Sequence, residues 1–252
     1  MIERREHGDV TVLELRHGKA NALDVELLDD VRAHLEQLGR DGRAVVLTGH
    51  DGFFCAGVDL RRVVDSDRTY TVDLIAALDR CLGEMVRFPR PLVAAINGHA
   101  IAGGLVLACA CDYRLVGSDE ARLGLTELAV GVPFPPRAFE VVRLAVGAVT
   151  AKRLVLGADL IESRQAVDLG IVDEVVASED LESRAVEVAT SWARLPEKTF
   201  ALTKSQLNSE LELRLGDQPA DLAAAVRECW ISEPTRAAIK RFVAAKLSGG
   251  RV

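Results

Sequence analysis

The segment Asn97-Gly98-His99-Ala100-Ile101-Ala102-Gly103-Gly104-Leu105-Val106-Leu107-Ala108 lies between two apolar runs. Pro91-Leu92-Val93-Ala94-Ala95-Ile96 precedes it, and its own apolar end continues to Ala110. This order predicts a buried strand, a glycine turn and a buried helix. Glycines at such a junction let a backbone come close because they carry no Cβ, and the first N–H groups of a helix have no intrahelical acceptor. We therefore expect a site at this turn.

The expected helix carries only apolar side chains in its first turns. If the site is catalytic, its acid or base must come from another part of the chain.

Around this segment, the hydrophobic pattern predicts strands and helices in alternation, followed by helices alone. Strands are expected at 10–15, 43–49, 113–116 and 171–176, and helices at 24–38, 73–85, 180–194, 197–212, 219–230 and 235–247. Strand–helix units followed by helices predict an α/β core with a helical C-terminal region. We assign residues 1–195 to the core and 196–252 to that region.

Composition excludes several classes of protein. The chain has 252 residues, is 49% hydrophobic and carries a net charge of −7, so a nucleic-acid groove is disfavoured. No apolar run is long enough to span a membrane, and the charged N-terminus lacks a signal-peptide pattern. Only one residue separates Cys109 from Cys111, which is too tight for a usual zinc site. We expect a cytoplasmic protein with no metal, no membrane contact and no nucleic-acid partner.

A second segment, Phe54-Cys55-Ala56-Gly57-Val58-Asp59, has the same design as the glycine turn, with small residues after a buried strand. Each segment can present a backbone N–H group in a tight turn. Two such donors that converge on one point form an oxyanion hole. Either segment alone is also typical of an ordinary strand–helix turn.

Taken together, the motifs resemble those of the crotonase superfamily, the enoyl-CoA hydratase/isomerase family. The resemblance covers most of the chain and rests on Asn21-Ala22-Leu23, residues 54–60, residues 97–104, Cys111-Asp112-Tyr113-Arg114, Gly124-Leu125-Thr126-Glu127, residues 166–173 and Leu202-Thr203-Lys204. It implies the crotonase (ClpP/crotonase-like) fold, with repeated ββα units and a C-terminal helical region that forms a homotrimer or a dimer of trimers.

The resemblance also implies a site for an acyl-CoA thioester. The two oxyanion-hole amides would be those of Val58 and Gly103. The groove for the CoA and thioester groups would be formed by Ala56, Gly57, Asp59, Leu60, Arg61 and Gly104, and the CoA head would lie near Lys19 and Ala20. Alternatively, Lys19 and Arg61 are solvated surface charges, and Asp59 caps the helix that follows it. CoA is part of the substrate, so no separate cofactor is expected.

Hydratases of this family use two glutamates, and here the chain departs from their pattern. One glutamate position is occupied by Val106, and the other by Glu127. A single carboxylate beside an apolar residue can move one proton from C2 to C4 of an acyl chain without water. The sequence resembles Δ3,Δ2-enoyl-CoA isomerases in this respect, which implies that Glu127 is the catalytic base.

An apolar wall that includes Val106 and Leu128 is expected to raise the pKa of Glu127 by desolvation. The amides of Val58 and Gly103 would stabilise the enolate. Alternatively, Glu127 is a surface carboxylate on a loop.

Several alternatives stay open at this point. The chain could be an enoyl-CoA hydratase, a non-catalytic acyl-CoA-binding protein, or an enzyme for another reaction that uses the same oxyanion hole. His99 is a candidate base but is more typical of a hydrogen-bonded structural histidine. Phe134 could line the acyl pocket or belong to the core.

Overall fold

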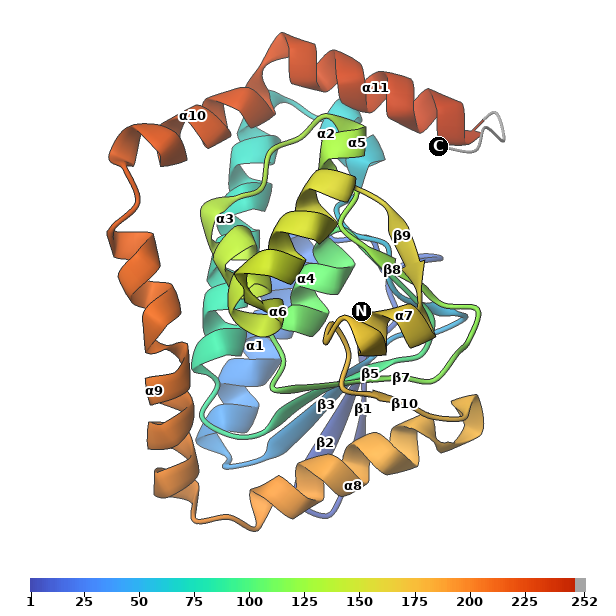
Figure 1. Cartoon of the computed structure of the whole chain (residues 1–252), viewed down its shortest axis with the longest axis vertical. Coiled ribbons are helices and arrows are strands. Elements are labelled where there is room, and N and C mark those ends of the chain that lie inside the picture. Colours follow the sequence, from blue (N-terminus) through green and yellow to red (C-terminus); the bar gives the residue numbers. More distant parts are fainter. Residues whose placement is uncertain (248–252) are drawn as a thin grey trace.

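The computed structural model describes residues 1–247, which form two β-sheets enclosed by helices (Figure 1). The strands are β1 (Ile2–His7), β2 (Val10–Leu15), β3 (Ala44–Thr48), β4 (Phe53–Cys55), β5 (Leu92–Ile96), β6 (His99–Ile101), β7 (Tyr113–Val116), β8 (Arg122–Gly124), β9 (Leu160–Glu162) and β10 (Glu174–Val175). The helices are α1 (Val25–Arg40), α2 (Leu60–Asp65), α3 (Arg68–Arg87), α4 (Gly103–Cys109), α5 (Glu127–Val130), α6 (Pro136–Gly157), α7 (Ser163–Asp168), α8 (Leu181–Ala193), α9 (Glu197–Gly216), α10 (Ala220–Ile231) and α11 (Glu233–Leu247).

The larger sheet has the strand order β1-β2-β3-β5-β7-β10 and is parallel except for the β1–β2 pair. Its central strands β3 and β5 are buried along their whole length because both faces of the sheet are covered. In β3, Val45 and Leu47 belong to the main core, whereas Ala44 and Val46 pack with α8. The sheet is therefore a buried layer, with α8 along one face (Figure 1).

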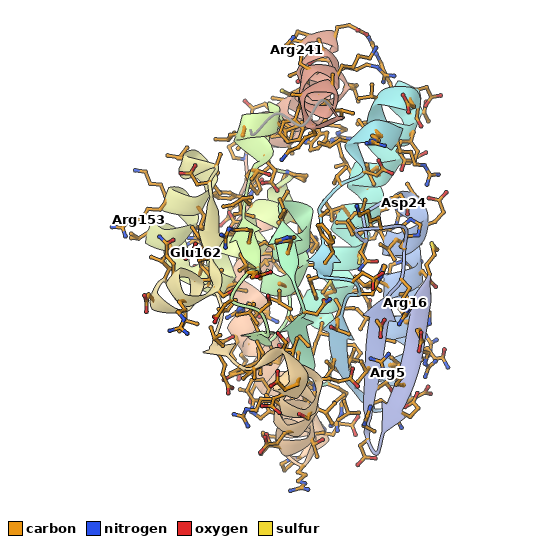
Figure 2. All side chains as sticks on the ribbon, turned by 90° about the vertical axis from the view of Figure 1, so that its right-hand side faces the viewer. Arg5, Arg16, Asp24, Arg153, Glu162 and Arg241 are labelled. Carbon is orange, nitrogen blue, oxygen red and sulfur yellow. The ribbon has the colours of Figure 1, made fainter. Side chains whose placement is uncertain are left out.

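The N-terminal strand β1 was not predicted. It pairs antiparallel with β2 at the edge of the sheet and is rich in charge, so it lacks the hydrophobic signal of the central strands. Arg5 bonds Glu182 at 2.5 Å, and Figure 2 shows Arg5 on β1 and Arg16 just beyond β2. Charged residues are typical of edge strands because they oppose pairing with other chains.

The smaller sheet, in the order β4-β6-β8-β9, corrects the prediction of a simple strand, turn and helix. After β5, the chain forms the short strand β6 before α4 begins at Gly103. Gly98 permits this crossing: a Cβ there would lie 1.9 Å from the Gly52 carbonyl oxygen, which accepts the His99 N–H at 2.9 Å. Strands of three residues leave little periodicity in a sequence.

Two predicted boundaries were wrong. The strand expected at 171–176 is limited to Glu174–Val175, because the Ile171 N–H instead bonds the Ala166 carbonyl at the end of α7. The helix expected at 73–85 extends over α3, and Asp67 caps it by accepting the Tyr70 N–H at 2.9 Å.

The C-terminal helices α9, α10 and α11 run along the outside of the core (Figure 1). Lys204 of α9 pairs with Asp112 before β7 at 2.6 Å, and Trp230 Nε1 of α10 donates to the Pro133 carbonyl at 2.8 Å. The predicted boundary after residue 195 falls just before α9, but the division into two regions stays a prediction, and 248–252 lie outside the described residues. Within residues 1–247, no helix combines the length and hydrophobicity needed to cross a membrane.

We predict that Gly104→Ala lowers the free energy of unfolding by about 2 kcal/mol or more, because overpacking a close contact costs this much. A Cβ at this position would lie 2.1 Å from the Cys55 carbonyl oxygen. Gly216→Ala is the control: nothing lies within 4 Å of its Cβ position in α9, so stability should not fall. Chemical denaturation measures both, and equal stability of Gly104→Ala and the native protein would contradict this packing.

Candidate active site

A cavity of about 580 Å³ lies where the two glycine-containing segments meet. Residues of α2, α3, α4, α5, α6, α10 and α11 contribute to its wall. Most of them are apolar. The lining side chains and backbone groups belong to Ala56, Val58, Leu60, Leu78, Ile101, Ala102, Gly103, Val106, Thr126, Glu127, Ala129, Val130, Val132, Pro135, Ala138, Gly157, Ala158, Asp159, Leu160, Trp230, Phe242 and Lys246.

Val58 lines this cavity, and its N–H has no hydrogen-bond acceptor among the described residues. The peptide groups on either side of Val58 are both used in a parallel bridge to Leu23. Leu23 N–H donates to the Gly57 carbonyl at 2.8 Å, and Asp59 N–H donates to the Leu23 carbonyl at 2.9 Å. This bridge holds the Val58 amide in a fixed orientation.

The Gly103 N–H is the first of α4 and likewise has no acceptor within residues 1–247. Ala102, directly before it, has φ +51° and ψ −123°, a conformation that side chains disfavour and that often marks functional sites. A Cβ on Gly103 would lie 3.7 Å from the Val58 nitrogen, so the two segments are in contact. Two fixed donors on one cavity can stabilise a negatively charged oxygen.

Asn21 holds the first of these segments in place. It is fully buried at φ +51°, and its side-chain amide donates to the Phe54 carbonyl at 3.1 Å. Its Oδ1 accepts the His17 N–H at 2.8 Å. The Asn-Ala-Leu motif therefore fixes the strand that leads to Val58.

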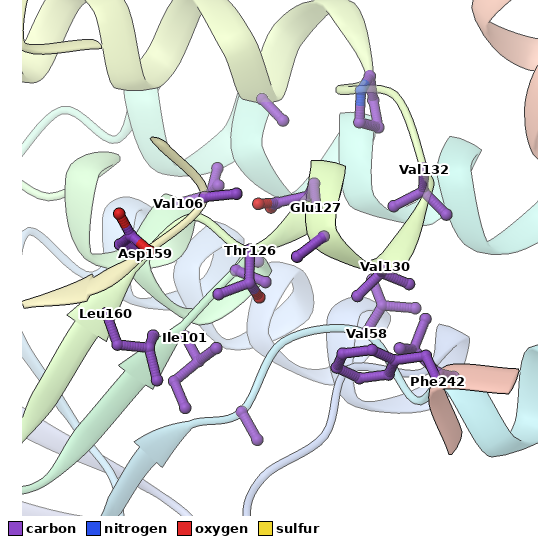
Figure 3. A pocket seen from close by; sticks show the side chains of 18 of the residues that line it. Val58, Ile101, Val106, Thr126, Glu127, Val130, Val132, Asp159, Leu160 and Phe242 are labelled. Atoms are coloured by element: carbon purple, nitrogen blue, oxygen red, sulfur yellow. The ribbon is translucent and has the colours of Figure 1, made fainter. Parts of the chain in front are cut away.

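Glu127 is the buried carboxyl group of the cavity. It begins α5 rather than lying in a loop, and it is only 8% exposed. Its Oε2 is buried and has no hydrogen-bond partner, and Figure 3 shows the carboxyl group directed towards Val106. Burial raises the pKa of Glu127 from 4.5 to about 7, and its own backbone N–H opposes the shift. The group is poised to accept and return a proton near neutral pH.

Of the two residues predicted to form an apolar wall beside Glu127, only Val106 does so. Val106 is 1% exposed and lines the cavity, but Leu128 is 45% exposed and does not. Successive residues of a helix point to different sides, so Leu128 cannot share the direction of Glu127. Val130 and Val132 take its place in the cavity wall.

Asp159 is a second carboxyl group on the cavity that was not predicted from the sequence. It follows Ala158, the left-handed C-cap of α6, and its side chain has no hydrogen bond or ion pair among the described residues. In the view of Figure 3, Val106 lies between the carboxyl groups of Glu127 and Asp159. A negative charge just after a helix C-terminus is electrostatically unfavourable because that end of the helix dipole is also negative. An aspartate at such a position is therefore a sequence signal for a functional role.

The remaining predicted site residues fall into two groups. Ala56 and Leu60 line the cavity, but Gly57 and Gly104 do not; they serve the close packing beneath it. The residues assigned to CoA lie outside the cavity: Lys19 and Arg61 are exposed, Ala20 accepts the Ala56 N–H at 2.9 Å, and Asp59 accepts the Arg62 N–H at 3.0 Å as the N-cap of α2. Their contacts with CoA stay predictions.

His99 and Phe134 take structural positions. His99 Nδ1 accepts the Arg122 N–H at 3.0 Å, and its ring packs edge-on against Phe53. Phe134 packs against Phe139, with ring centres 6.4 Å apart, and does not line the cavity. Within the described part of the chain, no three His, Cys, Asp or Glu side chains gather to hold a metal ion.

Comparison with known proteins gives consistent results. A family model described as enoyl-CoA hydratase/isomerase matches residues 5–244. The mouse protein "Enoyl-CoA delta isomerase 1, mitochondrial" is 30% identical over 82% of this chain and 73% of its own length. A Thermus thermophilus protein, "Putative enoyl-CoA hydratase", is 36% identical over 90% of this chain and 91% of its own length. Human mitochondrial delta3-delta2-enoyl-CoA isomerase superposes with a TM-score of 0.92, at 25% identity and 98% coverage of both chains, which confirms the predicted fold class.

We predict that Glu127→Gln stabilises the protein at high pH. The ionised carboxylate is costly where it is buried, and a pKa of about 7 instead of 4.5 corresponds to about 3 kcal/mol. Because the folded-state pKa is raised, the native protein loses this stability as pH rises from the unfolded value through about 7. Urea denaturation should show an advantage of about 3 kcal/mol for Glu127→Gln at pH 8 that falls below about 1 kcal/mol at pH 5. An advantage that is the same at both pH values would contradict a buried, desolvated Glu127.

Proposed function

The chain belongs to the enoyl-CoA hydratase/isomerase family and has the crotonase fold, and within that family we propose that it is a Δ3,Δ2-enoyl-CoA isomerase. The observation that carries the proposal is the pairing of Glu127 with Val106. Glu127 is buried, unpaired on one oxygen and directed towards an apolar side chain. A lone, desolvated carboxylate suits a proton shift, whereas hydration also needs a group that activates water.

In the proposed reaction, the thioester oxygen of a 3-enoyl-CoA accepts hydrogen bonds from the Val58 and Gly103 amides. The Glu127 carboxylate removes a proton from C2, and the electron pair moves onto the thioester oxygen. Each oxyanion donor of this kind contributes about 3 kcal/mol to transition-state stabilisation. Protonated Glu127 then delivers its proton to C4, and the double bond settles between C2 and C3. Glu127 is again a carboxylate, so the cycle closes without water.

Membership of the family supports an acyl-CoA thioester as the substrate and a role in fatty-acid metabolism. The cavity supports a hydrocarbon tail, because Leu60, Leu78 and Trp230 line it with apolar surface. We propose that isomerisation serves β-oxidation of unsaturated acyl chains.

A second candidate, hydration of a 2-enoyl-CoA, is favoured by Asp159. Its carboxylate lines the same cavity and is exposed, so water reaches it. It could accept a proton from water while the water oxygen bonds to C3 and protonated Glu127 supplies the proton at C2. A raised pKa on Glu127 fits the acid of such a pair.

We propose further that the protein assembles as a homotrimer or a dimer of trimers in the cytoplasm. Leu202, Leu207 and Leu213 of α9 are 58%, 70% and 67% exposed, an apolar surface that an interface would cover.

For the isomerase, we predict that Glu127→Gln lowers kcat by about 10²-fold or more, the usual contribution of a general base. The native enzyme should lose kcat/KM about tenfold per pH unit below about pH 7, because protonation removes the base. Asp159 and Lys246 are the other charged groups that line the cavity among the described residues. Conversion of a 3-enoyl-CoA to the 2-enoyl product, followed over pH 5 to 9, measures both. Full activity in Glu127→Gln would overturn the proposal.

For the second candidate, Asp159→Asn separates the two reactions. Hydration of crotonyl-CoA should fall at least tenfold, while isomerisation stays within about threefold of the native rate. Hydration should also weaken above about pH 7, opposite to isomerisation, because it needs protonated Glu127. Glu162→Gln is the control: its carboxylate is exposed on the next strand and pairs with Arg122 at 3.3 Å. Unchanged hydration in Asp159→Asn would remove this candidate.

A further inference from the structure

Helix α11 touches α5, which carries Glu127, and α2, which directly follows the Val58 segment. Helix α2 begins at Leu60, two residues after Val58, and α5 begins with Glu127. Both pack against α11, which crosses their ends on the outside of the molecule (Figure 1). The position of α11 therefore bears on the position of the oxyanion amide and of the base at once.

On the α2 side, the contact is made by Arg236. Its guanidinium donates to the carbonyl of Val63 at 3.3 Å, to that of Ser66 at 2.6 Å and to that of Val64. These carbonyls lie at the C-terminal end of α2, where helical partners run out and a positive charge is favourable. A planar guanidinium can serve three carbonyls in a fixed arrangement, which an ammonium group cannot reproduce. A second bond, between Glu233 and Arg68 at 2.7 Å, holds the start of α11 to α3.

On the α5 side, the contact is made by Ala238. Gly131 ends α5 with φ +93°, and a Cβ there would lie 2.9 Å from the Ala238 Cβ. Residues two apart on a helix point to nearly opposite sides. Arg236 and Ala238 therefore place one turn of α11 between the ends of α2 and α5.

The face of α11 that carries Ala238 continues to the cavity. Phe242 and Lys246 follow at intervals of four residues, and both line it. Helix α11 thus lies between the ends of α2 and α5 and also forms part of the wall of the cavity that holds Glu127.

We propose that Arg236 is a positioning residue, which holds α11 between α2 and α5 and thereby sets the Val58 amide relative to Glu127 across the cavity. The inference rests on the proposed function of that site. It assigns Arg236 no contact with the substrate: the residue acts through the C-terminal carbonyls of α2.

Loss of the Arg236 contacts should lower the pKa of Glu127, which loss of a residue with a structural role alone would not do. Desolvation by burial is the main cause of its raised pKa. If α11 lifts, water enters the cavity and the pKa of Glu127 falls towards 4.5. Asp159 and Lys246 are the other charged groups on the cavity wall among the described residues, and neither is a cause of the raised pKa of Glu127.

The test compares Arg236→Gln and Arg236→Lys with Arg241→Gln. Arg241 is exposed on α11, and Figure 2 shows it at the outer end of the molecule. In Arg236→Gln, we expect kcat for isomerisation to fall at least tenfold with KM changed less than threefold. The acid limb of kcat/KM should move at least one pH unit lower. Arg236→Lys should recover only part of kcat, and Arg241→Gln should match the native enzyme.

A second variant guards against loss of folding in Arg236→Gln. Ala238→Val wedges α11 away from Gly131 without touching Arg236, and it should shift the acid limb in the same direction. Carbon-13 NMR titration of glutamate carboxyl groups, with Glu127→Gln to assign the signal, reads the pKa of Glu127 without any turnover.

These readouts separate two kinds of failure. A native enzyme that does not isomerise 3-enoyl-CoA overturns the proposed function, whereas the NMR titration still tests the role of Arg236. A folded Arg236→Gln with native kcat, native acid limb and an unchanged Glu127 titration overturns the inference, even if its melting temperature falls.

Discussion

The carbonyl oxygen of Cys55 occupies the space where a side chain at position 104 would have to lie. This contact brings the first turn of α4 against the loop between β4 and α2. A Cβ at Gly57 would likewise come within 2.8 Å of the Ile101 carbonyl oxygen. Two backbones can meet this closely only because both lack side chains there. The two free amides share one cavity for this reason, and the bridge from Leu23 and the strained Ala102 keep them aimed at it.

A second constraint is the dry environment of Glu127. Isolating a carboxyl group among Val106, Val130 and Val132 costs stability once it ionises, and the same isolation makes it a stronger base. Such exchange of stability for reactivity is common at functional sites. The carboxylate of Asp159 lines the same cavity but is exposed to solvent. One site therefore holds a buried and a solvated carboxyl group.

Much of the fold was predictable because its central elements bury long apolar runs. β3, β5 and α1 stand close to their predicted places, and their hydrophobic pattern alone identifies them. β1 was missed because a charged edge strand has no such pattern, and β6 because three residues are too few to show one. Ile171 and Val172 were wrongly predicted to belong to a strand because they are apolar. They form a buried turn instead, in which both N–H groups donate to the Ala166 carbonyl at the end of α7.

By itself, the sequence determined the α/β class and the two glycine segments, and its resemblance to the enoyl-CoA hydratase/isomerase family implied Glu127 as the base, with Val106 at the position of the second glutamate. These depend on local composition and on motifs that are contiguous in the chain. Only the tertiary structure decided that Leu128 faces away, that Asp159 lines the cavity and that α11 stands between α2 and α5. Those facts depend on which elements, far apart in sequence, pack together, and the direction of a side chain in a four-residue helix is set by that packing rather than by its own sequence.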